Sequence, residues 1–191
     1  MRCPTVRLFS LFLFVILCFS FCLNAQAQQN EQELAVANFY KTILTFKDGG
    51  VPTRKNIDRL SPLISADFRN LLIAARDAED KQFKSTKGSE PPLVEGGLFY
   101  SLFEGADKYT SIKVEPNKEP VSYLVNLEYC DPYGKHEIVK WQDRAILINE
   151  NNRWVVHDLE LLGKWQFGTK GKLSEILLEV IEEGNDTNPP K

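Results

Sequence analysis

Apolar side chains in the first third of the chain recur with the period of helices. The segment 34–46 places five of them on one helical face: Val36, Phe39, Tyr40, Ile43 and Phe46. Two glycines at 49–50 follow this segment, so we expect the helix to end there. A second helical region is predicted over about 57–83 and is divided by Pro62, which cannot donate a backbone hydrogen bond. Ser65 is the expected N-cap after this break.

The second half of the chain changes to the two-residue alternation of strands. A short strand is predicted at 110–115, and three longer strands follow at 121–129, 136–148 and 154–162. The two asparagines of "ENNR" (150–153) tolerate the positive φ of a tight hairpin. The last two strands are therefore expected to be antiparallel neighbours.

Less regular segments separate and follow these strands. "DPYG" at 131–134 has Pro at the second position and Gly at the fourth, which indicates a turn. Residues 85–110 hold two prolines and four glycines and are predicted to form a long loop. An amphipathic helix is expected over 172–183, and 184–191 is interpreted as a frayed tail. This order of elements indicates an α+β domain.

A pairing scheme for the two hairpins assigns each strand residue to one face of the sheet, because side chains alternate across it. Centring the last hairpin on its two asparagines pairs Asp143 with Glu160. Centring the preceding hairpin on its Pro-Tyr dipeptide pairs Leu124 with Trp141. A single β-bulge would reverse the face of every residue beyond it.

Residues with candidate chemistry divide between two faces in this scheme. One face gathers carboxylates and tryptophans, a candidate binding set of Trp141, Asp143, Trp154, Asp158, Glu160 and Glu128. The other face is mostly apolar and contains a possible pocket set of His157, Arg144 and Tyr123. His157 and Asp158 are adjacent in sequence but point to opposite faces, so they are not expected to form an acid–base dyad.

Crowded carboxylates on a half-buried face can raise one another's pKa values and act as acid and base. Tryptophans beside them can bind a sugar or a cationic ligand. The alternative is a solvated sheet face with amphipathic tryptophans at its edge. For His157 the alternative is a core-edge histidine with a satisfied hydrogen bond.

No catalytic residue, cofactor or metal is assigned from sequence motifs. The chain has no G-x-S-x-G, H-E-x-x-H, C-x-x-C or glycine-rich phosphate loop. A calcium site is an alternative for the acidic residues of the long loop, but the regular spacing of oxygen ligands is missing from Glu90, Glu95, Glu104 and Asp107. A Cys130/His136 catalytic pair across the turn is a further alternative, although nothing marks the thiol as activated.

The amino-terminal segment has the three parts of a secretory signal. Two arginines precede an apolar run at 8–23, and the triplet 25–27 has the A-x-A pattern of a cleavage site. We expect cleavage after Ala27, which would leave 28–191 as one exported domain, periplasmic or secreted, with a polar lead-in at 28–33. Retention of the apolar run as a membrane anchor is the alternative; after cleavage no stable membrane span is expected.

Charge and cysteine content limit the kinds of binding partner and disulfide bond that are expected. The signal carries two of the 23 basic residues and none of the 26 acidic ones, so the exported domain would have 21 against 26 and a net charge of −5. This balance argues against nonspecific binding of nucleic acid. Cys130 is the single cysteine beyond the signal, so no internal disulfide is expected. We interpret Cys130 as a partly buried small residue, with an intermolecular bridge as the alternative.

Four segments carry a resemblance to a known family: "PPLVEGGLFYSLFEGA" (91–106), "LEYCDP" (127–132), "VKWQDRAILI" (139–148) and "RWVVHDLELLGKWQFGTKGKLSEIL" (153–177). They resemble a bacterial exported family that is known only as a domain of unknown function (number 3828), within the nuclear transport factor 2-like superfamily. The resemblance implies a cone, in which N-terminal helices pack on a curved antiparallel sheet with a pocket inside and a helix follows at the C-terminus. The family has no assigned reaction, so it supplies no catalytic residues.

The wider superfamily contains enzymes, such as ketosteroid isomerases and scytalone dehydratases, as well as binding modules. It often dimerises through the exposed sheet face, which would make Trp141 and Trp154 anchors of a homodimer interface. We expect a non-enzymatic exported protein that binds a small ligand or an envelope protein, at the carboxylate–tryptophan face or in the cone pocket. The alternative is an isomerase, dehydratase or hydrolase that uses these carboxylates.

Overall fold

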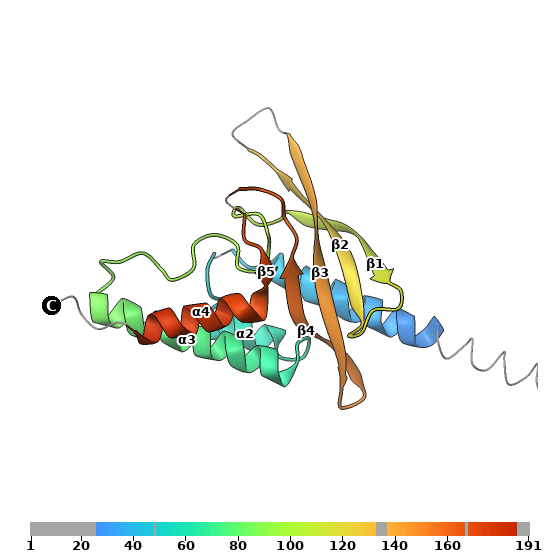
Figure 1. Ribbon diagram of the computed structural model, residues 1–191, viewed down its shortest axis with the longest axis horizontal. Helices are drawn as coiled ribbons and strands as arrows, with labels where there is room; N and C mark the ends of the chain where they lie inside the picture. Colours follow the sequence, from blue (N-terminus) through green and yellow to red (C-terminus); the bar gives the residue numbers. More distant parts are fainter. Residues whose placement is uncertain (1–25, 48, 133–136, 167, 187–191) are drawn as a thin grey trace, which may run out of the picture.

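The computed structural model describes residues 26–47, 49–132, 137–166 and 168–186. These residues form four helices and an antiparallel sheet of five strands in the order β1-β2-β3-β4-β5. The prediction of an α+β domain is therefore confirmed. In Figure 1 the first helix, in blue, crosses behind the sheet, whereas α3 and α4 lie side by side beyond the β4 edge.

The helices follow the predicted pattern, but the first helix ends at 43 rather than at the glycines 49–50, and the second begins at Arg54 rather than at about 57. They occupy 26–43 (the first helix), Arg54–Leu60 (α2), Ala66–Thr86 (α3) and Leu173–Asn185 (α4). Ser65 is the N-cap of α3, and its hydroxyl accepts the N–H of Phe68 at 3.2 Å. The predicted lead-in at 28–33 is wrong, because these residues are helical. One polar side chain of this segment has a partner in the sheet, since the Tyr123 hydroxyl donates to Gln32 Oε1 at 3.0 Å.

The strands are Lys108–Glu115 (β1), Ser122–Cys130 (β2), Ile138–Glu150 (β3), Arg153–Leu161 (β4) and Gly171–Lys172 (β5). The predicted hairpin is confirmed, with φ of 53° at Asn151 and 60° at Asn152. β5 is too short to have been predicted from alternation. The predicted turn at 131–134 lies partly outside the described residues. The last helix extends through 184–185, which the sequence assigned to the tail.

The predicted register between β2 and β3 is wrong. Leu124 lies opposite Arg144, and Trp141 lies opposite Leu127, so β3 is displaced by three residues from the scheme. The cause is the connection, whose last paired residues are Cys130 and Ile138, and which is longer than the assumed two-residue turn. Because the displacement is odd, every side chain of β3 changes face relative to β2.

The register between β3 and β4 is confirmed only near the hairpin. Predicted pairs hold from Glu150 opposite Arg153 to Leu147 opposite Val156. A bulge then inserts His157, so that Glu160 lies opposite Arg144 and the predicted pairing with Asp143 is wrong.

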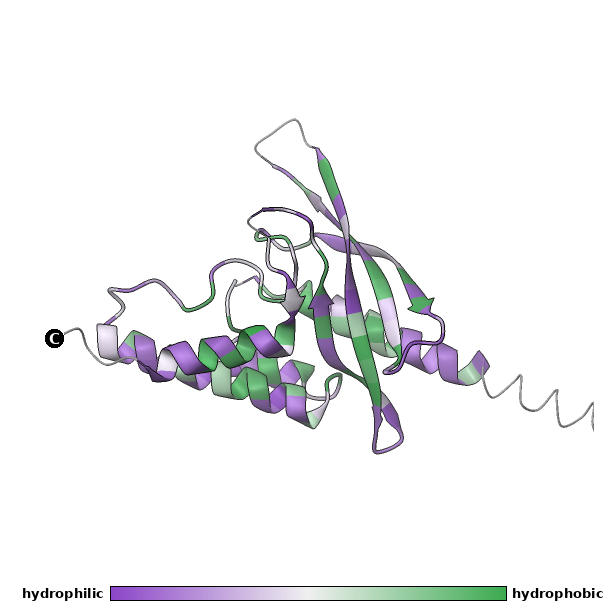
Figure 2. Ribbon diagram, viewed as in Figure 1, coloured by the Kyte–Doolittle hydropathy of each residue, from purple (hydrophilic) through white to green (hydrophobic). Residues whose placement is uncertain are grey.

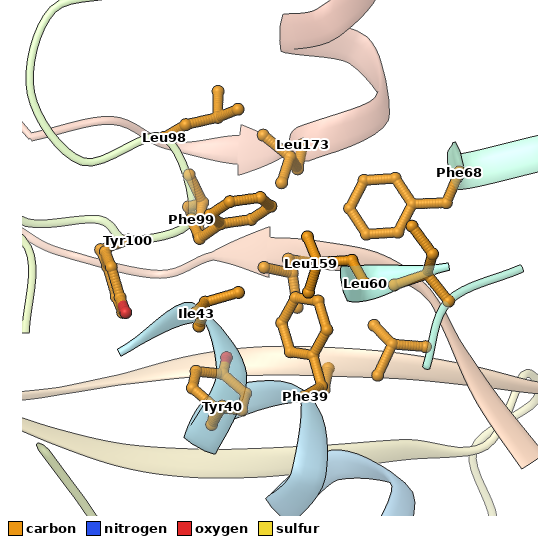
Figure 3. Packing of buried hydrophobic residues seen from close by; sticks show 14 of the residues in the cluster. Phe39, Tyr40, Ile43, Leu60, Phe68, Leu98, Phe99, Tyr100, Leu159 and Leu173 are labelled. Atoms are coloured by element: carbon orange, nitrogen blue, oxygen red, sulfur yellow. The ribbon is translucent and has the colours of Figure 1, made fainter. Parts of the chain in front are cut away.

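The sheet has an inner face that packs against the helices and an outer face that is mainly polar. Tyr123, Val125 and Leu127 of β2 are buried on the inner face. Figure 2 shows apolar and polar residues alternating in bands along the strands. On the helix side the aromatic packing centres on Phe39, whose ring meets that of Phe99 edge-on at 5.9 Å (Figure 3).

Candidate functional site

The six residues predicted to form one binding face are divided between the two faces. Because of the corrected register and the bulge, the outer face receives Asp158, Glu160 and Glu128, and the inner side receives Trp141, Asp143 and Trp154. The expectation of one surface that combines these carboxylates with the tryptophans is therefore wrong.

Two of the outer carboxylates are held in ion pairs. Glu128 contacts Lys140 at 2.9 Å and Lys108 at 3.0 Å, and hydrogen bonds from these lysines keep the pKa of Glu128 below its usual value. Glu160 pairs with Arg144, which also contacts Glu115. Carboxylates held by cationic partners in this way are suited to structure and solubility rather than to proton transfer.

The third outer carboxylate, Asp158, caps the start of α4. It accepts the N–H of Ser174 at 3.0 Å and the hydroxyl of the same residue at 2.6 Å. Lys172 occupies the N-cap position and makes no capping hydrogen bond with its side chain. Asp158 thus satisfies a helix N-terminus from a neighbouring strand, where a negative charge is favourable.

The predicted pocket set is not brought together. His157 Nδ1 lies 2.9 Å from the Ser65 hydroxyl at the start of α3, Arg144 lies on the outer face, and Tyr123 lies on the inner face. His157 therefore fits the alternative of a histidine with a satisfied hydrogen bond. His157 and Asp158 contact different helices, as expected of residues that do not form a dyad.

The inner carboxylate, Asp143, is fully buried and accepts four hydrogen bonds. Oδ2 accepts from the N–H of Ser101 at 3.1 Å and from Nε1 of Trp141 at 2.9 Å. Oδ1 accepts from the Ser101 hydroxyl and, at 2.9 Å, from the N–H of Leu162. The same hydroxyl accepts the N–H of Gly163 at 2.8 Å. Asp143 thus joins the long loop, β3 and the segment after β4, and its acceptor sites are used.

The polar interior also contains two tyrosine hydroxyls without a hydrogen-bond partner in the described part of the chain, those of Tyr40 and Tyr100. Burial, followed by the charge of Asp143, raises the pKa of both phenols, so both stay protonated at neutral pH. Figure 3 shows both rings beside Ile43. A pocket of about 300 Å³ opens next to Tyr100, between the end of the first helix and the loop 96–106.

A larger groove of about 560 Å³ lies beside β3 and contains two tryptophans. It is lined by two short segments, Lys140–Gln142 of β3 and Leu162–Trp165 after β4. The rings of Trp141 and Trp165 meet edge-on with centroids 5.6 Å apart. A Cβ on Gly163 would approach the Trp165 ring to 2.7 Å and Ser101 Cβ to 2.4 Å, so glycine is required where the segment bends beneath the ring.

Charge at the groove is positive. Lys164 is exposed, and no salt bridge of the described residues includes it. Lys140 shares Glu128 with Lys108, so this trio keeps one excess positive charge. Aromatic rings flanked by lysines are suited to a partner with apolar and acidic groups. The sequence scheme included Trp141 but missed Lys164 and Trp165, which follow the last long strand outside its alternating pattern.

Cys130 is exposed, and the interpretation as a partly buried residue is wrong. Its N–H donates to Asp107 Oδ2 at 2.7 Å. His136, the other member of the alternative catalytic pair, lies outside the described residues. Within the described ranges, no cluster of three or more His, Cys, Asp or Glu side chains is arranged to hold a metal ion. No helix in those ranges is long and apolar enough to cross a membrane.

No protein-family model, no curated protein and no solved structure matches the chain.

Proposed function

We propose that this chain is a non-enzymatic, exported binding module whose site is the groove lined by Trp141 and Trp165. The observation that carries the proposal is the edge-on tryptophan pair in a groove of about 560 Å³, bordered by Lys164, which is exposed and forms no salt bridge with another described residue. The signal-like segment 1–27 supports export to the periplasm or secretion. A sheet with its inner face packed against the first helix supports a cone of the nuclear transport factor 2-like kind.

The carboxylates favour binding over catalysis. Asp143 accepts four hydrogen bonds, Asp158 caps α4, and Glu128 and Glu160 are in ion pairs. Each is engaged in holding the fold, so none is available to accept a proton from a substrate. The two tryptophans, in contrast, border open space.

Native mass spectrometry of the protein purified from an exporting host tests the proposal. We expect a retained mass on the wild type and on Trp154→Ala, whose ring lies in a different pocket. Trp165→Ala should lose that mass, because it removes one wall of the groove. A mass that survives Trp165→Ala would place the binding site elsewhere.

A second candidate function is an isomerase, dehydratase or hydrolase that acts in the interior. The observation that favours it is the pair of unpartnered hydroxyls on Tyr40 and Tyr100 near Asp143, since a buried donor without a partner can bind a substrate oxygen. Turnover that disappears in Tyr100→Phe would support this function over binding alone.

A homodimer through the outer sheet face would need anchors other than the predicted ones. Trp141 is 8% exposed and packs with the inner core, and Trp154 also packs against that core. The outer face instead has a ladder of polar side chains, in which Gln142 donates to Asn126 and Asn126 donates to Ser111. A dimer that used this face would therefore have a polar interface.

A further inference from the structure

β3 is longer than its partner on one side, which leaves part of its edge without a neighbouring strand among the described residues. β2 pairs with β3 from Ile138 to Ile146, whereas β4 pairs only with Arg144–Glu150. Residues 138–143 therefore have a strand on one side alone. The other side of this stretch is the wall of the tryptophan groove.

The direction of the backbone groups on this edge follows from two hydrogen bonds to the β2 side. Leu147 donates its N–H to Val121, and Glu137 accepts the N–H of Asp131. Alternate residues of an antiparallel strand turn their N–H and C=O groups to opposite neighbours, so odd-numbered residues of β3 face β2. Lys140 and Gln142 consequently direct their backbone groups into the groove.

Those groups have no partner in the described part of the chain: no backbone hydrogen bond there uses the groove-facing N–H or C=O of Lys140 or Gln142. Continued pairing would bring Leu162 opposite Gln142. Instead Leu162 donates its N–H to the side chain of Asp143 at 2.9 Å, and the chain leaves the strand. An unpaired strand edge is a template for a further strand.

We propose that the groove receives an extended, acidic peptide segment of a protein partner, which pairs with the edge of β3 at Lys140 and Gln142. This inference rests on the proposed binding function and specifies its partner. Main-chain hydrogen bonds give such a complex its affinity, and alternate side chains give it specificity.

The two faces of the added strand would have different environments. Side chains on the inner side would lie against Trp141 and Trp165, which favours apolar residues there. Side chains on the outer side would lie near Lys140, and Lys164 borders the groove, which favours aspartate or glutamate. The expected recognition pattern is therefore an alternation of apolar and acidic residues.

Selection from a library of random dodecapeptides displayed on phage, with the full chain as bait, tests this pattern. We expect enriched peptides that alternate apolar and acidic residues. Synthetic copies should slow the amide hydrogen exchange of Lys140 and Gln142, while the amides of Trp141 and Asp143, which face β2, should change little. Failure of any peptide to enrich, or enrichment of basic or unpatterned peptides, would overturn the inference.

Two charge variants provide the matched comparison. Lys164→Glu should weaken binding of an enriched peptide about tenfold, because it reverses the charge at the groove. Lys170→Glu makes the same change at an exposed position outside the groove lining and should alter the affinity less than about twofold. Equal effects of both variants would contradict an acid-selective groove.

The exchange data also separate this inference from the proposed function. Binding that is lost in Trp165→Ala while the amides of Lys140 and Gln142 exchange as before would keep the groove as the site but overturn strand addition. Amides already protected in the free chain would show that a segment of the chain itself occupies the edge. Protection that grows with protein concentration would indicate a second copy. Both of these last outcomes overturn the proposed partner.

Discussion

Asp143 accepts the backbone N–H of Leu162 at 2.9 Å, although the two residues belong to segments that have stopped pairing. The register of β3 and β4 would otherwise give this N–H to the backbone of Gln142. A buried side chain thus replaces a strand hydrogen bond, and the chain turns away at Gly163. The same contact that completes the core exposes the edge of β3 and forms the tryptophan groove.

Replacing Asp143 by Asn should destabilise the fold by about 3 kcal/mol, because a side-chain N–H₂ would face donors that now have an acceptor. Urea unfolding followed by circular dichroism measures this loss. Glu104→Gln, which changes an exposed carboxylate in the loop, is the control and should shift stability by less than about 0.5 kcal/mol. Equal stability of the two variants would refute the central structural role of Asp143.

Replacing Asp158 by Ala should cost about 1–2 kcal/mol, because the N-terminus of α4 loses its capping acceptor. Ser174→Ala removes only the hydroxyl and keeps the backbone donor, so its cost should be smaller. Equilibrium unfolding in urea gives both values. A neutral Asp158→Ala would mean that α4 does not depend on this cap.

Tyr40→Phe and Tyr100→Phe should leave stability unchanged or raise it by up to about 1 kcal/mol, since each removes a buried hydroxyl for which the described residues provide no partner. Thermal unfolding compares the two variants with the wild type. A loss of more than about 2 kcal/mol in either variant would show that its hydroxyl has an acceptor in solution, such as a bound ligand.

Features of this fold that depend on residues close together in the sequence can be predicted from it, whereas features that depend on distant residues cannot. The helices, the break at Pro62 and the Asn151–Asn152 hairpin depend on local patterns, and each was predicted. The register of β2 and β3 depends on the length of a connection that no periodicity marks. The bulge lies at His157, whose ring contacts Ser65, a residue that is distant in sequence.

The candidate site was harder to predict for the same reason. Asp143 and Trp141 could be selected as polar and aromatic residues in a strand, but their partner Ser101 belongs to the irregular loop. Trp165 lies after the last long strand, where alternation gives no face. Its position depends on the close approach of Gly163 to Ser101, which is a tertiary contact.

Stability should fall in acid partly through Glu115. The Arg144 hydrogen bond holds the pKa of Glu115 below its ordinary value of 4.5 in the folded state. The contribution of the ionised Glu115 to the free energy of unfolding is therefore fully present above pH 4.5. It is lost as the pH falls through the lowered folded-state pKa. Urea unfolding of Arg144→Gln and wild type across this range should show a smaller acid dependence in the variant. If the free energies of unfolding of the variant and the wild type depended on pH in the same way, the role assigned to the Arg144–Glu115 contact would be contradicted.

The most direct test of the open edge is amide hydrogen exchange, read by NMR, in the free chain. We predict slow exchange at Trp141 and Asp143, whose amides face β2, and fast exchange at Lys140 and Gln142, whose amides face the groove. Slow exchange at all four positions would contradict this prediction, because the edge of β3 would then already be paired.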